Sequence, residues 1–255
     1  MPRPLRSFRT PALILKRRDL GEADRLLTLF TPEYGKIDAV AKGARKPTSS
    51  KTGHVELYTR ADVLIAKGRD LDVLVQVEMQ EPFLALREDL VRGAYASYAV
   101  ELLDRFAYGA DEADAQLLFA LLNATLERLC SAEDPRLAMR YYEVHLLDAV
   151  GFRPELNECV VTREELRPVD QYFSFADGGV VSPEGVAGLP GMAALPLNTL
   201  KLLRHLQRSP YSQVAALSIS ETLHRDVERI LLGYLGSILE SRLQSIDFLR
   251  RIRRN

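Results

Sequence analysis

The chain has 255 residues, of which 47% are hydrophobic and 27% charged, as is ordinary for a globular protein of one large or two to three small domains. No run of about eighteen apolar residues and no hydrophobic leader is present, so neither a membrane span nor a signal peptide is expected. Its two cysteines, Cys130 and Cys159, are too few for a disulfide framework. We therefore expect a cytoplasmic protein.

Charge is distributed unevenly along the chain, although the net charge is only −1. Residues 1–80 carry 15 Lys and Arg against 10 Asp and Glu, a balance of +5. Residues 81–230 carry 14 against 23, a balance of −9, and residues 231–255 carry 5 against 2, a balance of +3. A basic head and a basic tail around an acidic body indicate a polyanionic partner, unless the segregation has no functional meaning.

The first eighty residues predict five β-strands, because branched or aromatic residues alternate with a period of two in 12–16, 25–31, 36–42, 55–66 and 71–79. The sequence Thr-Pro-Glu-Tyr-Gly at 31–35 places proline early and glycine late, which predicts a hairpin turn. Residues 43–53 offer almost nothing to bury and are expected to form a mobile loop. The pattern therefore predicts a small barrel with a cationic loop.

From Pro82 onward the hydrophobic period becomes helical. Apolar residues recur three and four apart in 84–108, 114–129 and 135–150, which predicts three helices. Prolines and glycines punctuate 152–195, which predicts turns and a small irregular subdomain. We therefore predict a multidomain α+β protein with a five-stranded barrel at 1–80, an α-helical domain at 81–151 and 196–255, and an irregular insertion at 152–195.

Helices are expected to resume after Pro196. The first covers 197–207, and a capping box of Ser218 and Glu221 predicts the start of a longer one. The apolar face of that longer helix is expected to consist of Leu223, Val227, Ile230, Tyr234 and Ile238. The chain should end in a frayed cationic tail that contains Arg250, Arg251, Arg253 and Arg254.

No set of residues predicts catalysis. The four histidines are scattered over different elements, and neither a His-Glu-x-x-His nor a Gly-x-Ser-x-Gly motif occurs. Gly43-Ala-Arg-Lys46 lacks the second glycine and the Ser or Thr of a phosphate-binding loop. Asp70 and Asp72 are interpreted as acids that solvate a turn rather than as metal ligands. We therefore predict no catalytic residue, no cofactor and no metal.

Nucleic-acid binding is the remaining interpretation. A small barrel whose edge loops carry cations and an aromatic residue is typical of sequence-tolerant binding, in which cations take phosphates and the ring stacks on a base. The candidate residues are Arg17, Arg18, Arg25, Tyr34, Lys36, Lys42, Arg45, Lys46 and Lys51. The alternative is that these cations serve only to keep the barrel soluble.

Several motifs in a fixed order resemble one bacterial family. They are Ala-Leu-Ile-Leu-Lys-Arg-Arg at 12–18, Gly-Glu-Ala-Asp-Arg-Leu-Leu-Thr-Leu-Phe-Thr at 21–31, Gly-Lys at 35–36, Ala-Lys-Gly-Ala-Arg at 41–45, Arg-Tyr-Tyr-Glu at 140–143 with Leu-Leu at 146–147 and Gly151, and Phe-Ser at 173–174 with Gly-Gly at 178–179. In order and spacing these motifs resemble the RecO family of DNA repair and recombination mediators over nearly the whole chain.

The resemblance implies an N-terminal OB-fold, a helical domain and a small inserted zinc module. It also implies a protein that is not an enzyme, binds single- and double-stranded DNA, anneals complementary strands and helps to load recombinase onto coated single-stranded DNA. The implied partners are RecR and the acidic C-terminal tail of single-strand-binding protein. Arg140 matches the family's arginine in Arg-x-x-Glu, and Arg136 lies one turn earlier. Both are expected at the mouth of an apolar groove for that tail, although an Arg140–Glu143 pair along a helix is the alternative.

The chain departs from the resemblance at the zinc module. Many members carry Cys-x-x-Cys twice, whereas this chain has Cys159 with Thr162 and Ser182 with Gly185. Zinc needs about four nitrogen or sulfur donors, so we predict that the metal is absent. The hairpin from Phe173 to Val181 should then hold by packing, with Phe173, Phe175 and Val180 inward.

Two other functions stay open from the sequence. An RNA-binding OB-fold protein of translation or ribosome assembly would use the same cations and aromatic residue. A nuclease that uses the scattered acids is the second alternative, and the absence of a catalytic motif disfavours it.

Overall fold

The protein is described from a computed structural model, whose described residues are 7–46, 49, 51–107, 111–186, 191–240 and 243–252. The chain forms two compact units: the first comprises Met1–Ser131 and Phe248–Asn255, and the second comprises Ala132–Asp247. We call them unit 1 and unit 2 and treat each by itself. The division into domains at 1–80, 81–151 with 196–255, and 152–195 stays a prediction.

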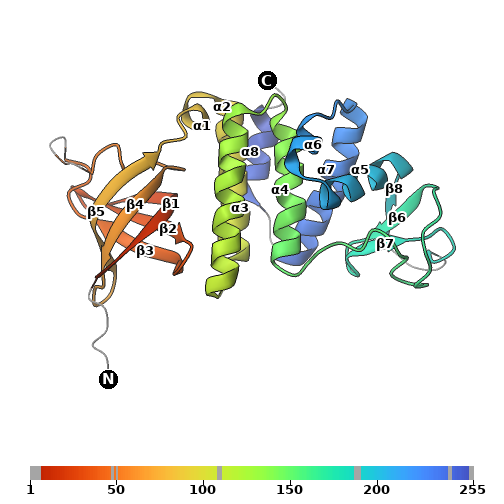
Figure 1. Ribbon diagram of the computed structural model, residues 1–255, viewed down its shortest axis with the longest axis horizontal. Coiled ribbons are helices and arrows are strands. Elements are labelled where there is room, and N and C mark those ends of the chain that lie inside the picture. Colours follow the sequence, from red (N-terminus) through yellow and green to blue (C-terminus); the bar gives the residue numbers. More distant parts are fainter. Residues whose placement is uncertain are drawn as a thin grey trace. The chain divides into compact units, whose positions relative to one another are not determined.

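Unit 1 begins with a closed barrel of five strands, as predicted. The strands are β1 Ser7–Leu20, β2 Asp24–Thr31, β3 Gly35–Ala41, β4 Arg60–Ala66 and β5 Asp72–Glu81. They close in the order β1-β2-β3-β5-β4 (Figure 1), which makes the barrel OB-like. Alternate residues face inward and form a core that includes Ile14, Leu27, Leu29, Ile37, Val63, Ile65 and Leu74.

Several strand boundaries differ from the prediction. β1 runs on to Leu20, so Arg17 and Arg18 lie in a strand and not in an edge loop. Residues 55–59 precede β4 as turns, although Val55 is fully buried in the barrel core. The hairpin predicted at 31–35 is confirmed, since Thr31 pairs with Gly35 where β2 turns into β3.

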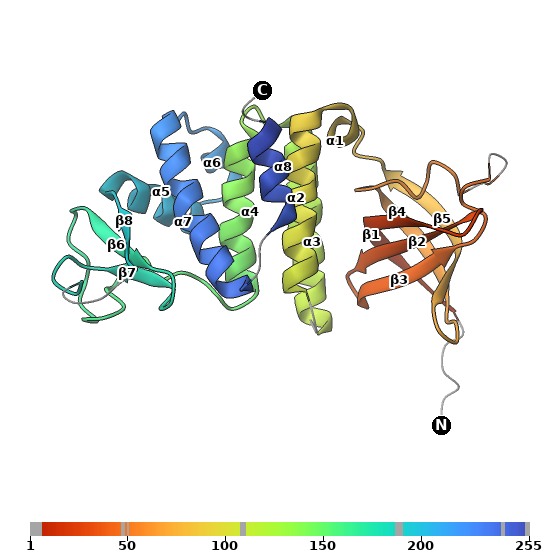
Figure 2. The same cartoon turned by 180° about the vertical axis from the view of Figure 1, so that it is seen from behind.

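Helices α1 Ala85–Glu88, α2 Leu90–Phe106 and α3 Glu112–Ser131 complete most of unit 1. α3 lies beside the barrel and contacts β2 and β3 (Figures 1 and 2). The single helix predicted at 84–108 is wrong, because Asp89 interrupts it. The Asp89 side chain accepts hydrogen bonds from the backbone N–H groups of Val91 and Arg92 at 2.8 and 3.0 Å, and so caps α2.

Unit 2 combines helices with a three-stranded sheet. Its helices are α4 Pro135–Ala149, α5 Leu197–Arg208, α6 Tyr211–Ala215 and α7 Glu221–Leu239. The strands β6 Gln171–Ser174, β7 Gly179–Val181 and β8 Ala193–Leu195 form a sheet in the order β7-β6-β8. The predicted hairpin is confirmed, with Phe173 paired to Val180 and both buried, whereas Phe175 is only partly buried.

The two ends of the C-terminal helical run differ from the prediction. α7 is capped by Ser220 and not by Ser218, because the Ser220 hydroxyl accepts the hydrogen bond of the Leu223 N–H at 3.2 Å. α8, Gln244–Ile252, includes the backbone of Arg250 and Arg251, so the frayed tail is wrong for these positions. Arg253 and Arg254 lie outside the described residues.

Candidate nucleic-acid interface

Most of the predicted cations gather at one end of the barrel, where the β1–β2 turn meets the loop after β3. The Arg45 N–H donates to the Ala23 carbonyl at 2.9 Å, and the Gly43 N–H donates to Asp24 Oδ1 at 2.8 Å. Gly21 and Gly43 have φ values of 60° and 69°, which allow both tight turns. These bonds join two loops at one end of the barrel, and we call the cations that lie there the basic ridge: Arg17, Arg18, Arg25, Lys42, Arg45, Lys46 and Lys51.

The loop is folded more tightly than the sequence suggests. Ala44 is fully buried in the barrel core, so the expectation that the loop buries almost nothing is wrong there. Thr52 Oγ1 donates to the carbonyls of Ala44 and Lys46 at 3.1 and 3.0 Å, which closes this part of the loop on itself. Residues 47, 48 and 50 of the loop lie outside the described residues.

Three arginines of the basic ridge are held by carboxylates. Glu56 binds Arg17 through one oxygen and Arg25 Nη1 through the other, the latter at 3.1 Å. Asp19 lies 3.6 Å from Arg25 Nε and 3.4 Å from Arg45 Nε. The sequence does not predict either carboxylate as a partner, because the pairing depends on strand register and loop packing. These arginines are therefore positioned and partly neutralised.

The other cations of the basic ridge are differently placed. Arg18, Lys42 and Lys46 are exposed, and within the part of the chain that the structure describes their side chains have no hydrogen bond or ion pair. The Lys51 ammonium donates to the Leu74 carbonyl at 2.7 Å. Burial lowers the pKa of Lys51, Asp24 opposes this, and the nearby charge of Lys42 adds to the lowering.

The surface keeps an excess of positive charge after pairing. The segments that carry the basic ridge, residues 17–25 and 42–46 with positions 51 and 56, hold seven cations against four carboxylates, namely Asp19, Glu22, Asp24 and Glu56, a balance of +3. Exposed cations on a net positive surface are the arrangement that binds a phosphate backbone. Arg18, Lys42 and Lys46 can meet phosphates without first losing another contact.

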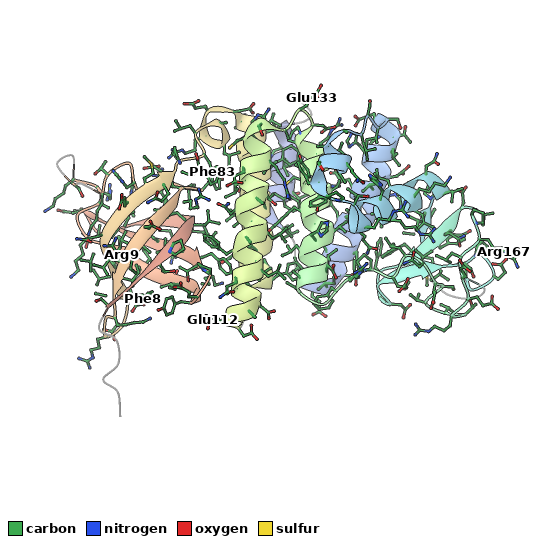
Figure 3. The ribbon with its side chains drawn as sticks, viewed as in Figure 1. Phe8, Arg9, Phe83, Glu112, Glu133 and Arg167 are labelled. Atoms are coloured by element: carbon green, nitrogen blue, oxygen red, sulfur yellow. The ribbon has the colours of Figure 1, made fainter. Side chains whose placement is uncertain are left out.

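Tyr34 and Lys36 lie away from the basic ridge, at the opposite end of β2. The eight residues of β2 separate the two turns by roughly 23 Å. Tyr34 is 45% exposed and packs on Phe8, with ring centroids 4.1 Å apart. The label of Phe8 in Figure 3 marks this end of the barrel. Lys36 Nζ lies 3.1 Å from Asp104 Oδ1 of α2. The predicted set of nine residues therefore divides into two places.

The Tyr34 end is less suited to phosphates than the basic ridge. A groove of about 450 Å³ there is lined by Tyr34, Lys36 and Lys67 and by three aspartates, Asp38, Asp70 and Asp72. Lys67 is already bound to Asp72 at 2.8 Å. These acids repel a phosphate chain, so a contact of Tyr34 with a base would stand apart from the phosphate contacts.

The two arginines expected at a groove mouth are both paired in unit 2. Arg140 is only 4% exposed at its side chain and binds Glu143 at 2.8 Å, which confirms the alternative pair, although it is buried. Arg136 is 31% exposed and binds Asp134 at 3.1 Å and Glu221 at 2.6 Å. Of the two, Arg136 is the more accessible to a partner.

Asp134 organises this corner of unit 2. It caps α4 by accepting the Arg136 N–H at 2.9 Å, and it lies 2.9 Å from Nε2 of His224. Burial raises the pKa of Asp134, but the hydrogen bonds from Arg136 outweigh it and lower the pKa overall. Burial lowers the pKa of His224, and Asp134 opposes this.

The residues at the expected zinc positions do not fit zinc. The four positions supply one thiol, two hydroxyls and a glycine without a side chain. Hydroxyls are poor zinc donors beside the thiolate, imidazole and carboxylate groups that zinc prefers. In the described part of the chain, no three Cys, His, Asp or Glu side chains are grouped so that they could hold a metal ion.

Comparison with known proteins assigns the family. The model of the RecO N-terminal domain matches residues 5–83, and the model of the RecO C-terminal domain matches residues 87–246. This chain belongs to the RecO family. Membership in the family gives it a role in DNA repair and recombination.

Individual RecO proteins match over most of their length. The DNA repair protein RecO of Roseiflexus sp. (strain RS-1) is 40% identical over 249 residues, which cover 97% of this chain and 87% of the relative. That of Dehalococcoides mccartyi (strain BAV1) is 35% identical over 246 residues, 96% of each chain. That of Symbiobacterium thermophilum is 33% identical over 248 residues, 96% of this chain and 98% of the relative.

RecO membership agrees with the barrel and helices described above. The two family models meet between residues 83 and 87, where β5 has ended and α1 begins. Within the residues that the structure describes, no helix is both long and apolar enough to cross a membrane.

Proposed function

We propose that this chain is a recombination mediator that binds single- and double-stranded DNA, anneals complementary strands and, with RecR, helps to load recombinase onto DNA coated by single-strand-binding protein. The observation that supports DNA binding is the basic ridge, with its balance of +3 and its exposed Arg18, Lys42 and Lys46. Binding and annealing need no covalent bond to be made or broken, so the chain acts without catalysis.

The basic ridge suits a phosphate chain rather than a particular base sequence. Cations that contact phosphates position the nucleic acid but carry no sequence information. Sequence-tolerant contact is what annealing requires, because any pair of complementary strands must be held. Tyr34 is 45% exposed at the far end of β2. It is proposed to stack on a base of a nucleotide that lies beyond the basic ridge.

The experiment is a salt series of single-stranded DNA binding to the wild type and to Arg18→Ala/Lys42→Ala/Lys46→Ala. Each phosphate contact contributes about −0.7 to the slope of log affinity against log salt. If three to five phosphates are bound, the wild-type slope is about −2 to −3.5. Loss of three cations should make the slope of the variant shallower by about 2.

A control variant separates a local surface from net charge. Lys201→Ala/Arg208→Ala/Arg225→Ala removes the same three charges from exposed positions of unit 2. It should retain wild-type affinity and slope. If both variants weaken binding equally, the basic ridge is not the interface, and tighter binding of RNA than of DNA would favour an RNA-binding role instead.

The coating-protein tail is proposed to bind in unit 2 through Arg136. Its terminal carboxylate would take the place of Glu221, which is the more exposed of the two carboxylates that hold Arg136. Arg140, buried against Glu143, would position the helix and not touch the tail.

A further inference from the structure

Two short turns in unit 2 meet around a single sulfur atom. The first covers residues 159–162 and the second residues 182–185, each with two residues between its ends. The Cys159 side chain is fully buried between them. Its Sγ accepts the Thr162 N–H at 3.4 Å and the Ser182 N–H at 3.3 Å. One thiol therefore ties together two turns that are 23 residues apart in the chain.

The fourth position also points at this sulfur. A Cβ added to Gly185 would lie 3.2 Å from Cys159 Sγ. The Gly185 N–H donates to the carbonyl and the hydroxyl of Ser182 at 2.9 and 3.2 Å, which fixes the second turn. The backbone thus brings positions 159, 162, 182 and 185 to one point, although three of them lack a soft donor.

Packing and backbone hydrogen bonds hold the rest of the irregular insertion, whose described residues are 152–186 and 191–195 and which we call the module. Val160 N–H donates to the Val180 carbonyl, and Val180 N–H donates to the Glu155 carbonyl, both at 2.9 Å. Phe173 and Val180 are buried side by side in the β6–β7 hairpin. The ring of Phe175 lies against Gly233 of α7, where an added Cβ would come within 2.4 Å of it. The module is therefore anchored to α7 on one side and to the sulfur on the other.

We propose that this module folds without zinc, that Cys159 Sγ takes the place of the metal by accepting one backbone hydrogen bond from each turn, and that the surrounding backbone still has the shape of a tetrahedral zinc site. The residues at these four positions do not fit the zinc ion of the family. The geometry points to a replacement, in which hydrogen bonds to one sulfur hold together the two turns that zinc and four thiolates would hold. The proposal does not depend on DNA binding.

The first test is metal content. Purified wild type should contain no stoichiometric zinc, and its thermal midpoint should be the same with and without EDTA. Stoichiometric zinc, or a midpoint that EDTA lowers, would overturn the proposal.

The second test rebuilds the site. Thr162→Cys/Ser182→Cys/Gly185→Cys should bind one zinc ion per chain, gain thermal stability with zinc and lose it with EDTA. Cobalt should give the visible absorption of a tetrahedral thiolate site. If this variant does not fold, Thr162→Cys/Ser182→Cys keeps Gly185 and supplies three thiolates for the same cobalt titration. Absence of metal binding in both variants would show that the backbone lacks the shape of the site.

The third test removes the sulfur. Cys159→Ala should lower the thermal midpoint by about 3–8 °C, since the backbone N–H groups of Thr162 and Ser182 lose their acceptor and a fully buried side chain is truncated. Cys130→Ala, at the partly exposed free cysteine of α3, is the matched control and should change it little. Equal midpoints for Cys159→Ala and the wild type would refute the role of Cys159.

Discussion

Glu56 gathers two arginines of the basic ridge around one carboxylate. Arg17 and Arg25 come from β1 and β2, and Glu56 comes from the turns before β4. A carboxylate between two guanidinium groups has the geometry in which arginines also hold a phosphate. Glu56 thus fixes the arginines in place and at the same time competes with any phosphate that approaches them.

Glu56→Gln should raise the affinity for single-stranded DNA by about two- to fivefold at low salt. The amide keeps the size of the side chain but removes the charge, so Arg17 becomes available to phosphates and Arg25 keeps only its contact with Asp19. The slope of log affinity against log salt should steepen by about 0.7 for each phosphate gained. Fluorescence anisotropy over a salt series measures both quantities.

Glu22→Gln is the control for net charge. Glu22 is exposed on the same surface, and in the described residues its side chain holds no arginine. The Glu22→Gln substitution removes one negative charge without releasing a guanidinium group. If Glu22→Gln tightens binding as much as Glu56→Gln does, the effect is one of net charge, and Glu56 does not compete with phosphate.

At the scale of elements, Asp104 fastens α2 to the barrel within unit 1. Its two oxygens lie 2.5 Å from Lys16 Nζ of β1 and 3.1 Å from Lys36 Nζ of β3. Lys36 Nζ also donates to the Asp104 carbonyl at 3.3 Å. Burial raises the pKa of Asp104, but the hydrogen bonds from the two lysines outweigh it and lower the pKa overall. The carboxylate thus joins α2 to β1 and β3 through two ion pairs.

Asp104→Asn should lower the free energy of unfolding by about 1 kcal/mol at neutral pH, because two partly exposed pairs are lost. Since the folded state depresses the pKa of Asp104, its contribution is present above the unfolded pKa of about 3.9 and disappears as pH falls through the folded value. Denaturant unfolding of both proteins from pH 7 to pH 3 measures this. The difference in the free energy of unfolding between the two proteins should be constant near neutrality and should narrow progressively as pH falls below about 4.

Glu88→Gln serves as the control for that series, since Glu88 is exposed on α1 and its side chain has no ion pair among the described residues. Its free energy of unfolding should follow that of the wild type at every pH. A gap for Asp104→Asn that persists unchanged at pH 3 would contradict the assignment of the effect to the ionised carboxylate.

The sequence predicted these elements where local periodicity decides them and failed where single contacts decide them. Five strands and the main helices follow from periods of two and 3.6 residues. The break before α2 depends on the cap that Asp89 makes, and the start of α7 depends on which of two serines binds a backbone N–H. Such choices are made by one hydrogen bond of roughly 1 kcal/mol, which periodicity does not register.

The candidate site shows the same limit. The cations were identified by type, but their grouping depends on register: Arg25 and Lys36 are eleven residues apart in sequence, yet β2 and β3 carry them to different ends of the barrel. The sequence does not predict Asp104 and Glu56 as partners, because their four ion pairs form only when distant segments pack. Sequence therefore predicted the chemistry of the surface but not which cations remain unpaired.

At the scale of the whole molecule, charge differs between the units. Unit 1 carries 23 Lys and Arg against 19 Asp and Glu, a balance of +4, whereas unit 2 carries 11 against 16, a balance of −5. Long-range attraction therefore favours a polyanion at unit 1 only. An acidic protein tail that binds unit 2 gains nothing from its net charge and must depend on a local arginine.

This reasoning predicts that DNA binding and tail binding are lost separately. Arg136→Ala should weaken the binding of a peptide with the acidic tail sequence by about tenfold, or about 1.4 kcal/mol, and leave DNA affinity unchanged. Glu221→Gln should tighten peptide binding about two- to threefold, because Arg136 loses a competing carboxylate. Arg18→Ala/Lys42→Ala/Lys46→Ala should show the reverse, with weak DNA binding and normal peptide binding.

Fluorescence titration of the peptide and of labelled single-stranded DNA against the same full-length variants provides the comparison. Circular dichroism confirms that Arg136→Ala is folded, since Arg136 also braces the cap of α4 through Asp134. If Arg136→Ala binds the peptide as tightly as the wild type does, the tail does not use Arg136. If Glu221→Gln instead weakens the binding of the peptide, Glu221 positions Arg136 for the peptide carboxylate and does not compete with that carboxylate.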